Sequence, residues 1–228
     1  SVMAKKLFPD FAPYISMAMT PMVLTARLLK KEHKNCKVVF IGPCAAKKLE
    51  ASRRTIRSDV DFVLTFEEAL GIFAAKGMDK AFLPEDEEEL PAYSSRDARR
   101  FAYSGGVAQA VVNAIHDMQP EREVKVAAAT GLAECRKLLM MAKAGKYDGY
   151  LLEGMACPGG CINGGGQPIK DDYDKVAERC KVLYGLDKVN NVRFSHENPE
   201  VLQCYRDYFK EPLSEKSHEL LHTSHTVR

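Results

Sequence analysis

A short strand that runs into a glycine-rich loop with two cysteines decides the fold of this chain: residues 149–168 read GYLLEGMACPGGCINGGGQP. We predict a strand from Gly149 to Glu153, since the run is short and mostly apolar. The thiolates of Cys157 and Cys161 are of the kind that usually binds iron–sulfur clusters. The glycines let backbone approach a bulky inorganic group and direct amide N–H groups at its anionic atoms. The loop therefore predicts a cluster held against bare backbone.

Outward from this loop, strands and helices alternate along the chain. Short apolar runs predict further strands at residues 36–41, 61–64 and 124–129, followed by helices at 45–54, 65–76 and 131–143. Near-continuous apolar strands that alternate with helices are typical of buried, mostly parallel sheets. The predicted fold class is therefore α/β, with mostly parallel strands flanked by helices and a helical C-terminal region. We expect residues 1–170 to form the α/β part of one catalytic domain and residues 171–228 its helical extension.

Several helix boundaries can be predicted from capping residues. Thr20 followed by Pro21 is typical of a helix start, with the threonine as the cap. Residues 65–68, TFEE, read as a capping box. A further helix is expected from Ser104-Gly105-Gly106 to His116, and 200–209 is the clearest helical segment of the C-terminal region. The acidic run at 83–90 predicts a solvated surface loop or short helix.

Composition excludes several classes of partner and location. The 228 residues carry 33 basic and 31 acidic side chains with no basic block, so neither nucleic acid nor an anionic membrane is implied. There is no run of 18 apolar residues, so we expect no membrane span. Seven widely spaced cysteines do not resemble a secreted disulfide framework. We therefore expect a reducing cytoplasm, with most cysteines buried as small apolar residues.

A third thiol has a position similar to those of the loop. Cys44 follows the predicted strand at 36–41 and precedes a predicted helix, and sites in α/β sheets favour this carboxyl edge. If the strands lie in one α/β unit, the three thiols can converge there. A structural zinc site is the nearest alternative, although it usually has Cys-x-x-Cys pairs and four protein ligands. A phosphate-binding loop is less favoured, because no Lys-Ser/Thr follows the glycines.

Two stretches resemble signatures of the [FeFe]-hydrogenase family. Residues 42–50, GPCAAKKLE, resemble its second signature, and residues 155–168, MACPGGCINGGGQP, resemble its third. The tail is similar to the closing region of the family at residues 195–199, 205, 208–209 and 218–222. The resemblance covers essentially the whole chain. It implies reversible reduction of protons to dihydrogen at a [4Fe-4S] cubane joined by a cysteine sulfur to a two-iron unit with CO and cyanide.

The resemblance also implies roles for particular residues. Cys44 and Cys157 would bind the cubane, and Cys161 would bridge the cubane and the two-iron unit. Lys47 would donate a hydrogen bond to a cyanide, and Glu50 would orient Lys47 from one helical turn away. The remaining assignments are Met155 packed against the two-iron unit, Ser16 on the proton path and Phe101 near the cluster.

One family signature is missing, and we expect the chain to begin just after it. That first signature has two adjacent cysteines before a proline, one a cubane ligand and the other a proton relay. With three of four thiolates, this fragment alone should neither hold the complete cluster nor turn over hydrogen. The expected partners are therefore the upstream segment of the same protein and a ferredoxin-type electron donor or domain.

A departure from the family leaves a second function open. Gly42 stands where the best-known catalytic members carry methionine, which suggests a divergent branch. The alternative to a catalyst is a non-catalytic hydrogen sensor, or an iron–sulfur assembly factor resembling the nuclear prelamin A recognition factor-like proteins. A zinc-binding relic of the fold is the third possibility. A cysteine pair in the upstream segment would favour turnover, and replacement of the proton-relaying cysteine would favour sensing.

Overall fold

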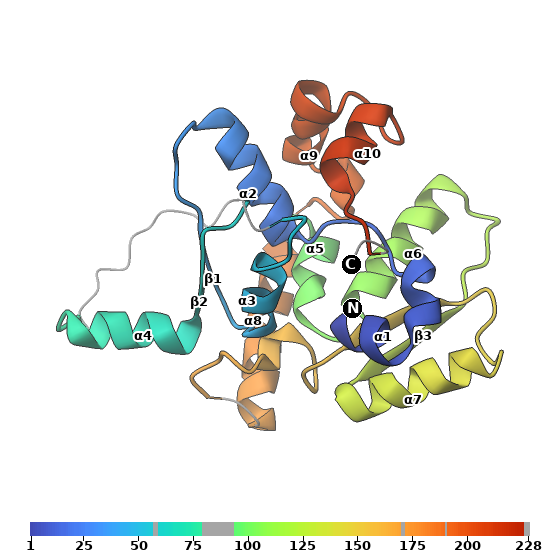
Figure 1. Ribbon diagram of the computed structural model, residues 1–228, viewed down its shortest axis with the longest axis horizontal. Helices are drawn as coiled ribbons and strands as arrows, with labels where there is room; N and C mark the ends of the chain where they lie inside the picture. Colours follow the sequence, from blue (N-terminus) through green and yellow to red (C-terminus); the bar gives the residue numbers. More distant parts are fainter. Residues whose placement is uncertain (57–58, 79–93, 170–171, 190, 226–228) are drawn as a thin grey trace.

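The computed structural model describes residues 1–56, 59–78, 94–169, 172–189 and 191–225, and it is built around two parallel two-stranded sheets (Figure 1). In the first sheet β1 (Val39–Gly42) pairs with β2 (Phe62–Thr65), and in the second β3 (Val126–Thr130) pairs with β4 (Leu151–Met155). Each predicted strand is present and ends one or two residues later than expected. The predicted α/β class with parallel strands is confirmed.

Helices precede or follow every strand of these sheets. Up to residue 169 the described helical elements are α1 (Val2–Leu7), a 3₁₀ turn (Pro9–Tyr14), α2 (Pro21–Glu32), α3 (Ala46–Ala51), α4 (Phe66–Ala75), α5 (Arg96–Arg99), a 3₁₀ turn (Arg100–Ala102), α6 (Gly106–Met118), α7 (Leu132–Lys143) and a 3₁₀ turn (Cys161–Asn163). The capping box is confirmed: Thr65 Oγ1 accepts from Glu68 N at 3.1 Å, and Glu68 Oε2 accepts from Thr65 N at 2.8 Å. No helix in the described ranges is long and apolar enough to cross a bilayer.

Two predicted segments differ from the structure or lie outside it. The helix α3 ends at Ala51 rather than at residue 54, and the Ser52 hydroxyl donates to the Leu49 carbonyl at 2.9 Å just there. A serine that bonds to nearby backbone competes with helical pairing, which explains the early end. The acidic run at 83–90 lies outside the described residues.

The first sheet is buried on one face only. The face toward α2 contacts a buried cluster through alternate side chains such as Phe40. On the other face Val39, Ile41 and Phe62 are 47%, 51% and 60% exposed. The prediction of a strand buried on both faces at 36–41 is therefore wrong for the described residues, because packing reaches only one side of the pleat. The buried cluster consists of Met22, Val23 and Ala26 of α2 with Ile56 and Val60.

The second sheet packs against α7. Three alanines at positions 127–129 of β3 leave room for the helix, and Ala129, Cys135 and Leu138 form a buried cluster there. The Cys135 thiol points at two carbonyl oxygens of the sheet, and burial raises its pKa. The other six cysteines are only partly buried, and none of the seven is in a disulfide. The expectation that most are buried is therefore wrong: among the seven described cysteines Cys135 alone is buried, and Cys36, Cys44, Cys157 and Cys161 lie in loops or turns.

The C-terminal part is helical, as expected from the change of pattern at Asp171. Its described elements are α8 (Tyr173–Val189), a 3₁₀ turn (Ser195–Glu197), α9 (Pro199–Cys204), a π-helical turn (Tyr205–Phe209) and α10 (Glu215–Leu221). Asn198 caps α9, because its Oδ1 accepts from Glu200 N at 2.9 Å. The predicted helix at 200–209 is thus α-helical at first and π-helical in its last turn. Figure 1 shows α9 and α10, in red, next to each other.

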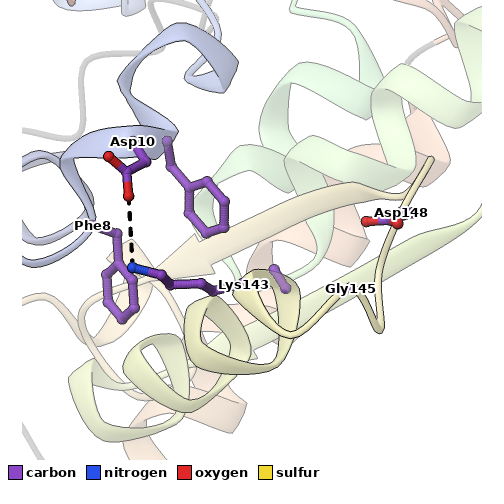
Figure 2. Close-up of a pocket in the computed structure, with 7 residues that line it drawn as sticks. Phe8, Asp10, Lys143, Gly145 and Asp148 are labelled. Atoms are coloured by element: carbon purple, nitrogen blue, oxygen red, sulfur yellow. Dashed lines mark ion pairs between the residues drawn. The ribbon is translucent and has the colours of Figure 1, made fainter.

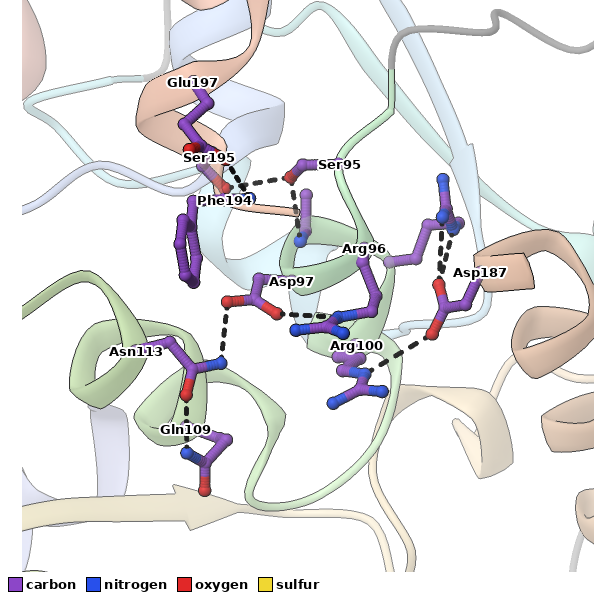
Figure 3. Close-up of polar contacts among 12 residues, drawn as sticks. Ser95, Arg96, Asp97, Arg100, Gln109, Asn113, Asp187, Phe194, Ser195 and Glu197 are labelled. Carbon is purple, nitrogen blue, oxygen red and sulfur yellow. Dashed lines mark hydrogen bonds and ion pairs between the residues drawn. The ribbon is translucent and has the colours of Figure 1, made fainter. Parts of the chain in front are cut away.

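Polar contacts tie this C-terminal part to α5 and α6 (Figure 3). The His196 Nε2 atom lies 2.9 Å from Asp117 Oδ2 of α6, while the buried Asp97 carboxylate joins α5 to α6 by accepting from Asn113 Nδ2 at 2.8 Å. The hydroxyls of Ser95 and Ser195 lie 3.1 Å apart. Asp187 of α8 accepts from Arg99 Nε at 3.0 Å. Such contacts fix the C-terminal helices on the α/β part, while the division of the domain at residue 170 stays a prediction.

Candidate metal-cluster site

Two loops that follow strands of different sheets meet at the candidate site. The loop after β1 carries Cys44, and the loop at 157–168, after β4, carries the other two thiols. They touch at Pro43, whose carbonyl oxygen accepts a hydrogen bond from Gly166 N at 2.9 Å. Gly164 packs so closely that a Cβ there would lie 2.2 Å from the same oxygen. The loops therefore converge, although their strands belong to two sheets rather than one.

The glycines of this loop let backbone approach backbone. Gly160 has a φ of +102°, and a Cβ there would lie 2.6 Å from Tyr103 Cα. On the other side, Gly159 N donates to Thr130 Oγ1 at 2.8 Å, at the end of β3. The loop is thus held between β3 and the segment before α6. Sequence reasoning assigned the glycines to an inorganic group, whereas Gly160 and Gly164 are required by packing against the protein itself.

The Cys161 thiol lies within electrostatic reach of Cys44, Lys47 and Cys157. Burial and then the Cys44 thiol raise the pKa of the Cys161 thiol, while the Lys47 ammonium lowers it and Cys157 raises it further. Because such influence weakens with distance, these groups share one site. Among the described residues, no three His, Cys, Asp or Glu side chains stand close enough to hold a single metal ion.

Lys47 and Glu50 form an ion pair along α3. Lys47 Nζ lies 2.6 Å from Glu50 Oε2, and the two side chains are 21% and 18% exposed. Lys47 is therefore not the exposed surface lysine that an amphipathic helix alone would give. The pairing one turn apart is the one expected, whereas the role of the pair toward a cyanide stays a prediction.

Thr20 also contacts this pair, which sequence reasoning missed. The helix α2 begins at Pro21 as predicted, but the Thr20 hydroxyl makes no capping bond. It donates instead to Glu50 Oε1 at 2.7 Å. The predicted capping role of this side chain is therefore wrong, because the hydroxyl donates its hydrogen bond to a carboxylate 30 residues away. No signal in the sequence joins the two residues.

Met155 and Phe101 lie next to the thiol loop. Met155 is the last residue of β4, partly buried and paired with Thr130 in the ladder. Phe101 is partly buried in the 3₁₀ turn Arg100–Ala102, and that turn contacts the turn that begins at Cys161. Their packing around a group bound by the thiols stays a prediction.

Within the part of the chain that the structure describes, the hydrogen bonds of Ser16 are made with Ala18 and His225 and not with the thiol loops. Its side chain is exposed, its hydroxyl accepts from Ala18 N at 3.3 Å, and its carbonyl contacts His225 Nε2 at 3.0 Å. Because Arg53 donates to the other ring nitrogen of His225 (3.4 Å), Nε2 carries the hydrogen. Burial, assisted by the Arg53 charge, lowers the pKa of His225. Ser16 is therefore held at the surface by the C-terminal tail.

Glu153 is a second residue that sequence reasoning missed. It is 8% exposed on β4, and its two carboxylate oxygens accept from Gly105 N and Ala108 N, each at 2.7 Å. It therefore caps the first turn of α6 from the strand that leads to Cys157. The signal was an acidic residue within an otherwise apolar strand, since a buried carboxylate needs partners.

A separate hollow is lined by none of the predicted site residues. It lies between the 3₁₀ turn Pro9–Tyr14 and the end of α7, with a volume of about 310 Å³ (Figure 2). Lys143 Nζ stands 3.6 Å from Asp10 Oδ2 at its edge. The hollow has no cluster-binding donors, so the thiol loops are the candidate site.

The chemistry of the converging residues fits an iron–sulfur cluster. Thiolates are its usual ligands, and a [4Fe-4S] cluster takes four, of which Cys44, Cys157 and Cys161 would supply three. The partly buried Cys161 thiol must lose its proton to bind, and the Lys47 ammonium favours that charged form.

Comparison with known families covers nearly the whole chain. Residues 1–165 match the family described as "Iron only hydrogenase large subunit, C-terminal domain", and residues 173–228 match "Iron hydrogenase small subunit".

Relatives of two kinds are similar to this chain. The NADP-reducing hydrogenase subunit HndD of Solidesulfovibrio fructosivorans is 31% identical, over 97% of this chain and 44% of its own length. Iron hydrogenase 1 of Clostridium pasteurianum is 29% identical, over 96% of this chain and 46% of its own length. The cytosolic iron-sulfur assembly component 3 of Bos taurus is also 29% identical, over 93% and 54%. The chain thus spans about half the length of these curated relatives.

Solved structures of hydrogenases have the same fold. A structure of the [FeFe]-hydrogenase HydA1 from Chlamydomonas reinhardtii matches with a TM-score of 0.77 and 29% identity. The match covers 97% of this chain and 73% of the HydA1 chain. A second [FeFe]-hydrogenase structure, from work on oxygen inactivation, has a TM-score of 0.78 at 27% identity, over 97% and 72%. The family match over residues 1–165, supported by these structures, shows that the chain belongs to the iron-only hydrogenase family.

Proposed function

We propose that the full protein catalyses the reversible reduction of protons to dihydrogen, at a [4Fe-4S] cubane joined to a two-iron unit with CO and cyanide. The observation that carries this proposal is the meeting of the Cys44 loop with the loop at 157–168, beside the half-buried Lys47. Hydrogenase relatives and solved [FeFe]-hydrogenases that align over nearly all of this chain support it.

In this proposal the thiols and one lysine hold the metal group. Cys44, Cys157 and Cys161 would hold the cubane, and Cys161 would also hold the two-iron unit. When bound, the group supplies iron centres that exchange electrons and take up protons. Lys47 donates a hydrogen bond to a cyanide, because an ammonium is the natural partner of an anionic group in a partly buried site. Glu50 keeps the Lys47 side chain directed there.

Three further residues control access of water and protons. Met155 and Phe101 pack around the group from β4 and from the turn before α6, and they exclude water from it. Ser16 is exposed, so its hydroxyl can exchange protons with solvent and stand at the outer end of the proton path.

The proposal includes partners beyond the described residues. A fourth thiolate comes from an upstream segment of the same protein, since three thiols converge here and a cubane needs four. Electrons come from a ferredoxin-type donor or domain. We place the protein in the cytoplasm, and no binding of nucleic acid or membrane is part of the proposed function.

A non-catalytic role is the second candidate, because an iron–sulfur assembly component is among the relatives. Gly42, at the end of β1, favours it, because it departs from the methionine of the best-known catalytic members; a Cβ there would lie 2.7 Å from the Phe40 ring of the same strand. A hydrogen sensor on the same fold is the other form of this candidate. Rapid hydrogen turnover by the longer protein would contradict both forms.

Reconstitution of the chain with iron and sulfide without oxygen tests the site. We expect iron to bind but no hydrogen to evolve, because one cubane thiolate is missing and because iron and sulfide supply no CO or cyanide for the two-iron unit. Replacing Cys44, Cys157 or Cys161 by alanine should lower the iron content well below that of the unmodified chain, since each cubane iron takes a cysteine. Colorimetric iron analysis and gas chromatography of hydrogen measure the two quantities.

The matched control is Cys36→Ala, which removes a partly buried thiol outside the two loops and should leave the iron content unchanged. Equal iron loss in this control would refute the assigned site. Full hydrogen evolution by the chain alone would refute the need for a fourth thiolate. Retention of zinc in place of iron would favour the zinc alternative.

A further inference from the structure

Thr20 stands at the start of α2 in the backbone geometry of a capping residue. Its φ and ψ are −71° and 153°, and its carbonyl oxygen accepts from Val23 N at 3.0 Å and Leu24 N at 3.1 Å. A threonine in this place usually accepts an amide hydrogen bond through its hydroxyl. Here the hydroxyl donates to Glu50 Oε1 instead, so the side chain binds the carboxylate and does not cap the helix.

This contact divides the Glu50 carboxylate between two donors. Thr20 Oγ1 donates a hydrogen bond to Glu50 Oε1 at 2.7 Å, and Lys47 Nζ donates one to Glu50 Oε2 at 2.6 Å. With both oxygens occupied, rotation of the carboxylate would break one bond to a charged group. The orientation of the Lys47 ammonium is therefore set by Glu50, whose orientation is set by Thr20.

The segment that carries Thr20 is itself held by the C-terminal tail, residues 220–225. Met19 N donates to Leu221 O and Thr223 N donates to Met17 O, each at 2.8 Å, which makes a short antiparallel pairing around Ala18 and His222. Further contacts join the tail to α2, to the segment after α3 and to Ser16: Arg27 with Leu220 O (3.3 Å), Thr55 with Thr223 (3.2 Å), Arg53 with His225 (3.4 Å) and His225 with Ser16 O (3.0 Å).

We infer that Thr20 is a positioning residue for Lys47, acting through Glu50, and that the C-terminal tail keeps Thr20 in place. The inference deepens the proposed function, on which it rests for the importance of Lys47. The tail belongs to the part of the chain that matches the small-subunit family, whereas Lys47 belongs to the part that matches the large subunit. The tail is then a structural link from the second part to the charge partner of the cluster.

Proton exchange of the Lys47 ammonium with water tests the first half. In metal-free chain labelled with ¹⁵N-lysine, NMR measures this rate, and Lys47→Arg assigns the signal by removing it. Thr20→Val should speed exchange about tenfold, the factor expected for one lost hydrogen bond to a charged group. Thr20→Ser keeps a hydroxyl and should retain the original rate.

Thr25→Val is the matched control, an exposed threonine on the same helix. An unchanged rate in Thr20→Val, or an equal increase in Thr25→Val, would overturn the inference. Thermal unfolding of each variant shows that it is folded at the temperature of the measurement. Because no metal is present, failure of iron binding would refute the proposed function without touching this result.

A second pair of variants tests the tail. Thr223→Pro removes the N–H that donates to Met17, whereas Thr223→Val keeps it and removes only the hydroxyl that faces Thr55. In Thr223→Pro we expect both the Met19 amide and the Lys47 ammonium to exchange faster with water. In Thr223→Val we expect both exchange rates to stay unchanged. A faster Met19 amide with an unchanged Lys47 signal would refute the link from the tail to the lysine.

Discussion

Replacement of Gly160 by alanine is expected to lower the thermal midpoint by about 10 °C. The φ of +102° is a conformation that side chains rarely adopt, and a Cβ would lie 2.6 Å from Tyr103 Cα and from Ser104 N. Backbone strain and overpacking cost about 1–3 kcal/mol each. A chain of this size loses about 2–4 °C for each kcal/mol. Differential scanning calorimetry measures the midpoint.

The same loop offers a matched control. Gly165→Ala adds a Cβ with nothing within 4 Å and without a positive φ. We expect its midpoint to lie close to that of the unmodified chain. If both substitutions lowered the midpoint equally, the close approach to Tyr103 would not be the reason for glycine at position 160.

Glu153→Gln is expected to destabilise the chain by about 2–4 kcal/mol, the cost of leaving a buried donor without its charged acceptor. Glu153 is 8% exposed, and each carboxylate oxygen accepts one amide hydrogen of the first turn of α6. Glutamine offers one acceptor and would point its NH₂ group at the second amide. It also loses the negative charge that the N-terminus of α6 favours.

Urea unfolding followed by circular dichroism measures this loss. The control is Glu134→Gln on α7, where the side chain is 61% exposed and forms an ion pair with Lys137 at 3.8 Å. Since exposed pairs of this kind contribute about 0–1 kcal/mol, the control should change stability little. An unchanged midpoint in Glu153→Gln would mean that the carboxylate does not hold α6.

Much of the fold could be predicted because it follows from local patterns. A helix separates the apolar run at 124–129 from the strand at 149–153. Strands joined by such a helix pair in parallel, and β3 and β4 are paired in parallel. The open face of β1 could not be predicted, since Val39 and Phe40 are both apolar and only tertiary packing decides which is buried.

The site was predictable to the extent that it consists of motif residues. The loops with Cys44 and Cys161 could be found because thiols and glycines form compact sequence patterns. Thr20 could not, because its bond to Glu50 joins residues 30 apart and the same threonine suits a helix cap equally well. Glu153 was visible as an acidic residue in a strand, but its partners on α6 depend on how the strand meets that helix.

The placement of the thiols on two sheets has a thermodynamic consequence. Within the described residues, β1 and β2 share no strand pairing with β3 and β4. In the proposed function, a group bound to Cys44, Cys157 and Cys161 together would cross-link the two sheets, whose loops the Pro43–Gly166 hydrogen bond also joins, and its binding free energy would add to their association. Removal of that group would weaken the junction between the sheets before it affected either one. The metal content of a preparation would then set how cooperatively the two halves of the fold melt.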